Sequence, residues 1–231
     1  MKLLAEIEVR PENNAIIPPF TSKVGKTILK NYKLSISPLY DGEKFIFKES
    51  DVPTYIEVEG GKTYTFRVGG EEEEMIKALS QINDVNVFNT LWKIKDVKVS
   101  SVSLECKEYV KVDILTPAIF PDPFVKDEKK RFTNASFIVF AVNAMDEMKL
   151  RRGPELDKIL YDIEKNVSEE PSDYHSINVV YSNKKVKGIV GRMNFRIRGY
   201  FPELRSILEN AQAKGIGSSR HNGFGVVNIR C

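Results

Sequence analysis

The chain has 231 residues and 42% of them are apolar, which is enough for a substantial core, either in one large domain or in two smaller ones. We expect two. No run approaches the roughly 18 apolar residues of a membrane span, and the start MKLLAEIEVR carries charges where a signal peptide has an apolar block. The sequence therefore predicts a cytoplasmic protein with no membrane partner. Cys106 and Cys231 have no partner at metal-ligand spacing and only two histidines are present, so we expect no metal and no cofactor.

The net charge of +3 is unevenly distributed along the chain. Residues 183–231, the basic module, carry ten Lys and Arg residues against Glu203 and Glu209, which gives +8 and leaves −5 for the rest. Such an asymmetry favours a polyanionic partner, nucleic acid first. The alternative is a basic face that serves only solubility.

The first half of the chain has the periodicities of a mixed α and β domain. In chain order it predicts a strand, a helix, a hairpin around an Asp-Gly turn, a strand pair, a second helix and a closing strand pattern, over residues 2–9, 20–32, 33–49, 54–68, 71–82 and 86–105. Four glutamates open the second helix, where they suit the positive end of its dipole. The order is βαββαβ with an added hairpin, and we assign residues 1–105 to an N-terminal domain.

The second half repeats this order without repeating the sequence. It predicts a strand, two helices, a long hairpin around SNKK, a helix and a last strand, over residues 109–117, 135–150, 154–166, 176–199, 202–214 and 223–230. The proline-punctuated segment 120–132 is expected to be a loop. The predicted fold class is α+β, with two tandem ferredoxin-like, RRM-like βαββαβ domains whose antiparallel sheets carry helices on one side. The second domain spans residues 106–231.

The loop KGIGSSRHNGFGVV, residues 214–227, places four glycines around a short basic segment. Glycine lets a backbone approach a phosphate, but this loop leaves a helix and enters a strand, the reverse of a dinucleotide-binding fingerprint. The glycines should adopt conformations or close approaches that a β-carbon would block.

The strand IVGRMNFRIRG of the basic module has a second pattern. Arg192, Arg196 and Arg198 fall on one face together with Asn194, while Met193 and its neighbours of the same parity point the other way. Because an antiparallel sheet can expose one face, this row could follow an RNA backbone while Asn194 reads a base edge. The alternative is an ordinary solvent-facing strand.

Together, KVKGIVGRMNFRIRG, the following helix and GIGSSRHNGFGVV resemble the C-terminal signature of the Cas-six CRISPR RNA-processing endoribonucleases of the RAMP superfamily, and ISPL at 36–39 is similar to a short segment of their first domain. The resemblance implies CRISPR repeat RNA, that is precursor CRISPR RNA, as partner. It also implies metal-independent attack of a ribose 2′-hydroxyl on the adjacent phosphate, leaving 2′,3′-cyclic phosphate and 5′-hydroxyl ends. The residues expected to bind RNA are Lys185, Lys187, Arg192, Asn194, Arg196, Arg198, Gly215, Gly217, Ser218, Ser219, Arg220, His221, Gly223 and Gly225.

Many members of that family use a histidine in or near the first helix, and this chain has none there. Its histidines are His175, expected at or just before the start of a strand, and His221 in the glycine-rich loop; either is an alternative base. The first helix instead offers Lys23, Lys26 and Lys30 on one face, with Gly25 beside them. This is similar to the histidine-lacking archaeal branch of the family, and implies Lys26 and Lys23 as catalytic residues with Lys48 assisting from a nearby strand.

Two functions follow from different classes. The first is a repeat-specific endoribonuclease, and the second is a non-cleaving RNA-binding or scaffold subunit of a CRISPR effector complex. A single ferredoxin-like core with long insertions would favour the scaffold, whereas the doubled pattern favours the nuclease. CRISPR effector subunits as partners and a homodimer stay open.

Overall fold

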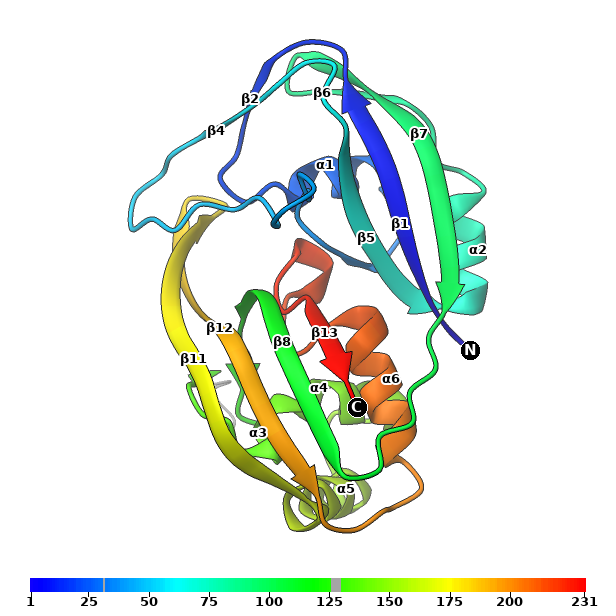
Figure 1. Ribbon diagram of the computed structural model, residues 1–231, viewed down its shortest axis with the longest axis vertical. Coiled ribbons are helices and arrows are strands. Elements are labelled where there is room, and N and C mark those ends of the chain that lie inside the picture. Colours follow the sequence, from blue (N-terminus) through cyan, green and yellow to red (C-terminus); the bar gives the residue numbers. More distant parts are fainter. Residues whose placement is uncertain (31, 126–129) are drawn as a thin grey trace. The chain divides into compact units, whose positions relative to one another are not determined.

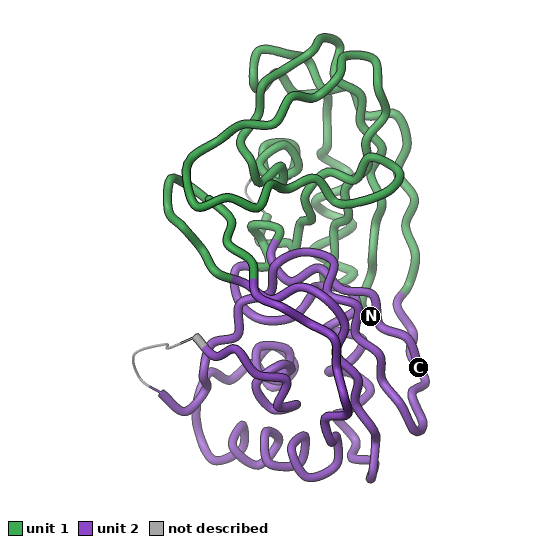
Figure 2. The backbone as a smooth tube through the Cα atoms, turned by 60° about the vertical axis from the view of Figure 1, so that its left-hand side comes forward, with its two compact units in different colours: residues 1–101, 177–187, 220–223 green, residues 102–176, 188–219, 224–231 purple. Residues whose placement is uncertain are grey.

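The computed structural model describes residues 1–30, 32–125 and 130–231, so residue 31 of the predicted first helix and residues 126–129 of the predicted loop lie outside the described residues. Two compact units make up the chain (Figure 2): unit 1 comprises residues 1–101, 177–187 and 220–223, and unit 2 comprises 102–176, 188–219 and 224–231. Each unit has an antiparallel sheet with helices packed on its buried face (Figure 1). The predicted α+β class is confirmed.

Unit 1 is built on a five-stranded sheet of order β3-β5-β1-β7-β6. Its elements are β1 (Lys2–Pro11), β2 (Ala15–Ile17), α1 (Ser22–Ile28), β3 (Ser35–Ile36), β4 (Ile56–Val58), β5 (Tyr64–Glu71), α2 (Glu72–Leu79), β6 (Val85–Val87) and β7 (Thr90–Ser101). The central strand β1 pairs antiparallel with both β5 and β7. Its alternate residues Ala5, Ile7 and Val9 are fully buried, as the alternation of KLLAEIEV predicts.

Both strands predicted over residues 54–68 form, but the prediction that they pair with each other is wrong, because they belong to different sheets. β4 pairs with β2, and β5 pairs with β1 and β3. The reason lies in the Gly60-Gly61 turn, whose amides donate to the Asn14 side chain and the Pro11 carbonyl. A β-carbon on Gly60 would clash with the backbone of Asn13, so the turn is fastened to the β1–β2 connection instead of closing a hairpin.

The hairpin predicted over residues 33–49 forms its turn but little ladder. The Asp41 carboxylate accepts hydrogen bonds from the backbone amides of Glu43 and Lys44, both at 2.9 Å, as an Asp-Gly turn requires. Among the described residues, one isolated bridge joins the two arms, between Tyr40 and Phe45. The other pairing of this segment is with different elements: β3 pairs with β5, and Tyr40, Phe47 and Glu49 form bridges with Thr65, Phe20 and Val179. Pro38 interrupts the strand because it has no amide hydrogen to donate to a ladder.

Helix α1 packs closely on the sheet of unit 1. A β-carbon on Gly25 would lie within 3.0 Å of the Ile36 and Phe66 side chains, so this glycine lets the helix sit directly on β3 and β5. The helix is shorter than predicted and is capped at Leu29, whose amide donates to the Gly25 carbonyl. Lys30 therefore lies beyond the helix and is exposed, which removes it from the predicted lysine face.

Unit 2 contains a four-stranded antiparallel sheet of order β11-β12-β8-β13 (Figure 1). Its elements are β8 (Tyr109–Ala118), β9 (Phe120–Pro121), β10 (Lys130–Arg131), α3 (Ser136–Val139), α4 (Ala141–Met148), α5 (Pro154–Asn166), β11 (Val167–Tyr181), β12 (Lys184–Ile197), α6 (Leu204–Lys214), the short 3-10 helix η1 (Arg220–Asn222) and β13 (Val227–Arg230), although η1 and the tip of the β11–β12 hairpin fold with unit 1. Disregarding the short β9–β10 pair, the order is β, α, β, β, α, β, which matches the predicted ferredoxin-like arrangement and places β8 between β12 and β13.

Strand β11 begins well before the predicted start of the hairpin. It follows α5 directly at Val167, so His175 lies inside the strand and the expectation that it stands at the strand start is wrong. Its first half is polar and includes Pro171, which an edge strand tolerates because one of its sides needs no ladder hydrogen bonds. This part of the strand was not predicted because its sequence does not alternate between apolar and polar residues.

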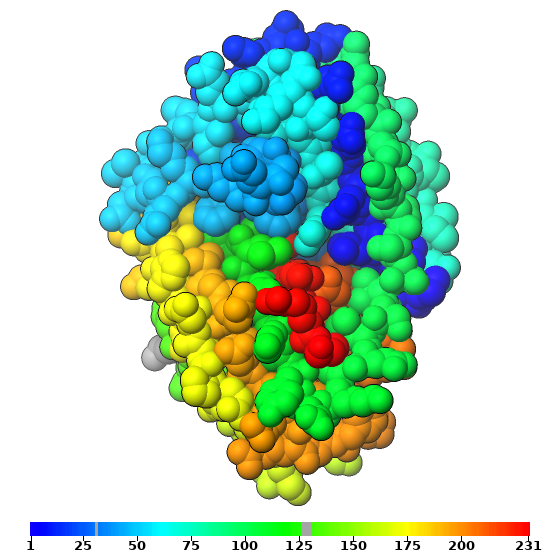
Figure 3. Space-filling model, viewed as in Figure 1, coloured from blue at the N-terminus to red at the C-terminus, as the bar shows by residue number. Residues whose placement is uncertain are grey.

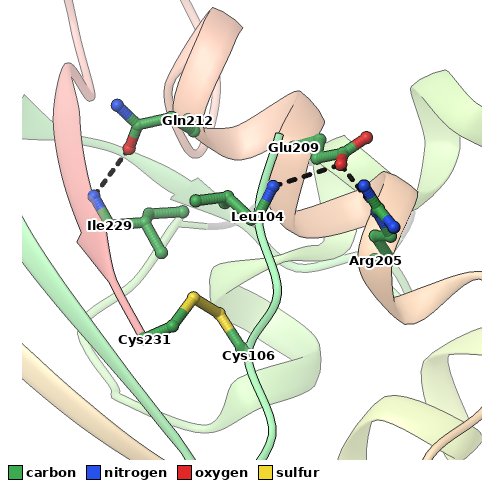
Figure 4. The surroundings of a disulfide bond; sticks show 7 residues. All are labelled: Leu104, Cys106, Arg205, Glu209, Gln212, Ile229 and Cys231. Carbon is green, nitrogen blue, oxygen red and sulfur yellow. Dashed lines mark hydrogen bonds and ion pairs between the residues drawn. A yellow bond between two sulfur atoms is a disulfide. The ribbon is translucent and has the colours of Figure 1, made fainter. Parts of the chain in front are cut away.

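A disulfide between Cys106 and Cys231 joins the segment that precedes β8 to the residue that follows β13 (Figure 4). The same region is tied to α6 by two side chains: Glu209 accepts the Leu104 amide at 3.2 Å, and Gln212 accepts the Ile229 amide at 2.6 Å. The bond joins residues 125 positions apart, a pairing that the sequence analysis did not predict.

Candidate functional site

The tip of the β11–β12 hairpin folds as part of unit 1. Its two-residue turn, Ser182-Asn183, has positive φ angles of 48° and 62°, as the predicted hairpin around SNKK needs. The Ser50 amide donates to the Asn178 carbonyl, and Lys185 forms an ion pair with Asp51 at 2.8 Å. These contacts hold Tyr181 beside helix α1.

Three side chains from distant parts of the sequence meet at α1. The Lys26 ammonium donates to the Asn222 side-chain oxygen at 2.5 Å and to the Tyr181 hydroxyl at 3.3 Å. The Tyr181 hydroxyl in turn donates to the same Asn222 oxygen at 2.8 Å. The donors and acceptors match, because an amide oxygen has two lone pairs and an ammonium has three protons. Two of the lysine protons are engaged in this triangle, so the third is left for a further acceptor.

Burial and charge set the protonation of this Lys26 cluster, which comprises Lys26, Tyr181, Asn222 and the adjacent His221. Partial burial lowers the pKa of Lys26, and burial raises that of Tyr181, which stays a neutral donor. Partial desolvation of the exposed His221 first, and then the charges of Lys26 and Arg220, lower the pKa of its imidazole. At neutral pH its imidazole is therefore uncharged and able to accept a proton.

The backbone of η1 is also fastened to the first helix. The Ser22 hydroxyl donates to the Asn222 carbonyl, and the Ser35 hydroxyl donates to the Arg220 carbonyl at 3.4 Å. Gly223 follows, with φ of 94°, and a β-carbon there would clash with Ser22, Phe20 and Pro38. Residues 220–223 are thus held on unit 1, which fixes His221 and Asn222 relative to Lys26.

The three predicted catalytic lysines are only partly brought together. Lys23 lies one turn before Lys26, with its ammonium 5.7 Å from the centre of the Tyr181 ring, so both lysines adjoin Tyr181. Lys48 is exposed and donates to the Thr54 hydroxyl at 3.2 Å, and among the described residues it makes no hydrogen bond with either of the other two lysines. Its assisting role stays a prediction.

The glycines of the predicted loop have the structural role expected of them. Gly215, Gly217, Gly223 and Gly225 all have positive φ, between 69° and 94°, and all four are buried. β-Carbons on Gly215, Gly217 and Gly225 would clash with backbone carbonyls of unit 2. The amides of Gly215 and Gly225 donate to Ala211 and Pro117, so these two glycines shape the loop and do not present their amides to a ligand. Ser218, Ser219, Arg220 and His221 form its accessible part.

Arg192 and Arg196 of the predicted arginine row lie on the helix-free face of the unit 2 sheet, where β11, β12, β8 and β13 reach the surface (Figure 3), whereas Arg198 follows the last residue of β12. Arg192, Arg196 and Arg198 are exposed, while Met193 and Phe195 are buried, as the alternation predicts. Acidic side chains on the neighbouring strands accompany two of these arginines.

Arg192 pairs with Asp113 at 2.7 Å, and Arg196 pairs with Glu170 at 2.9 Å and lies over the Tyr109 ring. The Asn194 side chain donates to the Pro171 carbonyl at 2.7 Å. The amide nitrogen of this side chain is therefore engaged with β11, and its predicted role in reading a base edge stays a prediction. Lys187 is exposed on the hairpin.

Tyr181 and Asn222 are the residues of the candidate site that sequence reasoning missed. Both stand next to features that were singled out, Tyr181 beside the SNKK turn and Asn222 after His221. They lie 155 and 196 positions along the chain from Lys26, so their side chains become relevant only through the fold that returns them to it.

Sequence comparison identifies the first part of the chain. Residues 3–102 match the family model of the Cas6 N-terminal domain. None of the curated proteins compared matches the chain. In the described part of the chain no helix is long and apolar enough to cross a membrane.

Solved structures share the fold over the full length. A Thermus thermophilus Cas6 superposes with a TM-score of 0.64 and 11% identity, covering 100% of this chain and 98% of that one. A Cas6 product complex gives a TM-score of 0.64 at 14% identity, with both chains covered completely. A Cas6-related protein from Pyrococcus furiosus gives 0.61 at 11% identity, covering 100% of this chain and 99% of that one. At these identities the likeness establishes the fold.

Proposed function

We propose that the chain, whose residues 3–102 match the family model of the Cas6 N-terminal domain, is a Cas6-family endoribonuclease that binds CRISPR repeat RNA and processes precursor CRISPR RNA without a metal ion. The Lys26 cluster carries this proposal, because it combines a cation, a neutral imidazole and a neutral phenol. Two structural relatives are described as Cas6 product complexes, which supports the same reaction class.

The reaction requires a base for the attacking hydroxyl. In the proposed step the neutral imidazole of His221 takes the proton of the ribose 2′-hydroxyl, and the oxygen attacks the adjacent phosphorus. Lys26 and Arg220 beside it favour this uncharged form before the reaction. This assigns to His221 the role that family members give to a histidine near the first helix.

The developing phosphorane needs a cation, and the leaving oxygen needs an acid. We assign both roles to Lys26, and its third proton, beyond the hydrogen bonds to Asn222 and Tyr181, supports this assignment. Its lowered pKa makes the ammonium a better acid for the departing 5′-oxygen. The P–O5′ bond breaks, the oxygen takes the lysine proton, and the products carry a 2′,3′-cyclic phosphate and a 5′-hydroxyl. Exchange with water then returns both enzyme groups to their starting states.

RNA contacts outside the cluster come from the basic module. We assign phosphate contacts to Arg192, Arg196, Arg198 and the accessible loop residues, with Lys185 and Lys187 at the hairpin. The ion pairs with Asp113 and Glu170 hold two of the arginines extended over the sheet, and a phosphate would compete with these carboxylates.

The test uses the repeat RNA of the host's own CRISPR array and a scrambled RNA of the same composition. The proposal predicts cleavage of the repeat at one phosphate, and no cleavage when the attacking nucleotide is 2′-deoxy. Tight repeat binding without cleavage would favour the non-cleaving scaffold function instead. Equal cleavage of the scrambled RNA would refute repeat-specific processing.

A further inference from the structure

A pocket of unit 1 adjoins the Lys26 cluster and has no role in the chemistry above. Its cavity volume is about 100 Å³, and its walls come from Pro18–Phe20, Lys23, Pro53–Tyr55 and the hairpin tip Val180–Asn183. Tyr181 belongs to both sites, because its ring lines the pocket while its hydroxyl donates to Asn222. Whatever occupies the pocket therefore lies next to the group bound by Lys26.

The walls of this pocket suit a flat aromatic group. Phe20 is buried and packs edge-on against Tyr181 with 5.8 Å between ring centres, so the inner wall is rigid. Tyr55 lies at the pocket with 67% of its surface exposed, so its ring is accessible to a ligand there. Thr54 and Asn183 add hydrogen-bonding groups to these aromatic and proline surfaces. Proteins that bind single-stranded RNA use this combination, with a base stacked on an aromatic ring and its edge hydrogen-bonded.

A cation lies on the side of the pocket that faces the cluster. Lys23 lines the pocket, and Lys26 follows three residues later, a rise of about 4.5 Å along the helix. A phosphate on Lys26 and a second anionic group on Lys23 would therefore belong to neighbouring positions of one strand. The pocket accordingly fits a base that is attached directly to the reacting phosphate.

We propose that this pocket binds the base of one of the two nucleotides joined by the scissile phosphate, stacked on Tyr55, and thereby selects the phosphate that is cut. The inference rests on the proposed function and adds a specificity-determining subsite to it. Stacking takes the base out of the RNA strand, which fixes the sugar and phosphate against Lys26. Tyr55 is a positioning residue in this scheme.

The test is a double-mutant cycle that combines a protein substitution with the removal of one RNA base. Binding is measured by fluorescence anisotropy with repeat RNA that is 2′-deoxy at the attacking nucleotide, so that it is not cut, and that carries one abasic site at each position in turn. Wild type is compared with Tyr55→Ala and Tyr55→Trp. Tyr161→Ala is the matched control, because Tyr161 is similarly exposed, at 65%, and lies on α5 of unit 2.

The proposal predicts that an abasic site next to the scissile phosphate weakens wild-type binding roughly 5- to 150-fold, the usual worth of one stacked base. Tyr55→Ala should show a similar loss with intact RNA and no further loss with that abasic RNA. Tyr55→Trp and Tyr161→Ala should resemble wild type. An abasic effect of equal size in Tyr55→Ala, or a Tyr55-dependent position remote from the cleavage site, would overturn the proposal.

Cleavage of all-ribose repeat RNA is followed in parallel. If wild type cuts the RNA and Tyr55→Ala retains both its affinity and its choice of phosphate, the pocket proposal fails while the nuclease function stands. If wild type binds but does not cut, the proposed function fails, and the scissile-base proposal fails with it. A Tyr55-dependent base in that abasic scan would then identify the pocket as a binding subsite of a non-cleaving protein.

Discussion

Replacing Lys26 by alanine removes the central group of the candidate site. The variant loses an ammonium that makes two hydrogen bonds and supplies a third donor for phosphate. Because the side chain is only partly buried, the loss of folding stability should stay under about 1 kcal/mol. Removal of a proton-transfer group typically slows a reaction by about 10² to 10⁴, which corresponds to roughly 3 to 5 kcal/mol of transition-state stabilisation. The expected loss of rate therefore exceeds the expected loss of stability.

The assay is single-turnover cleavage of repeat RNA at saturating enzyme, combined with a binding measurement on 2′-deoxy RNA. Lys26→Ala should be slowed at least about a hundredfold while its affinity changes by less than about tenfold. Lys33→Ala is the control, because Lys33 is an exposed lysine of the same unit outside the cluster. If wild type cuts and Lys26→Ala cuts equally fast, the assignment of Lys26 is refuted.

Three further predictions follow. The pKa of His221 is lowered, so the cleavage rate should rise with pH through a titration centred below 6.5, the ordinary histidine value. His221→Ala should abolish this rise. A pH–rate profile that is unchanged in the variant would exclude His221 as the base. Gly217→Ala should destabilise the fold by about 1 to 3 kcal/mol in urea unfolding, since Gly217 has φ of 71° and a β-carbon would clash with the Ile119 carbonyl, whereas Ser218→Ala should change it little. Asp113→Asn should tighten RNA binding a few-fold at low salt and steepen its salt dependence, because it releases Arg192 and Arg230, and unchanged binding would argue against RNA on this sheet face.

The parts of the fold that could be predicted are those in which burial leaves a local pattern. Alternating strands such as β1 and β12 and the amphipathic helices α2, α5 and α6 were recognisable because one face of each meets a core. The polar half of β11 was missed because it is an edge strand with little to bury. The partner of β4 was also missed, because the glycine turn that separates it from β5 is fastened by a distant asparagine.

Only the lysines and the glycine-rich loop of the candidate site could be predicted from the sequence. Helical spacing placed Lys23 and Lys26 on a common face, and four glycines marked the loop that ends beside them. Tyr181 and Asn222 carry no local signal, since their relevance arises from tertiary contacts with Lys26. Lys48 followed from a family resemblance, and its side chain contacts Thr54 at the edge of the neighbouring pocket.

The chemistry of the cleaved ends tests the central claim most directly. Repeat RNA is incubated with wild-type protein in excess EDTA, and the products are analysed by mass spectrometry. A base, an acid and a cation supplied by side chains predict full cleavage with 2′,3′-cyclic phosphate and 5′-hydroxyl ends. Cleavage that EDTA abolishes, products with 3′-hydroxyl and 5′-phosphate ends, or bound RNA left intact would contradict it.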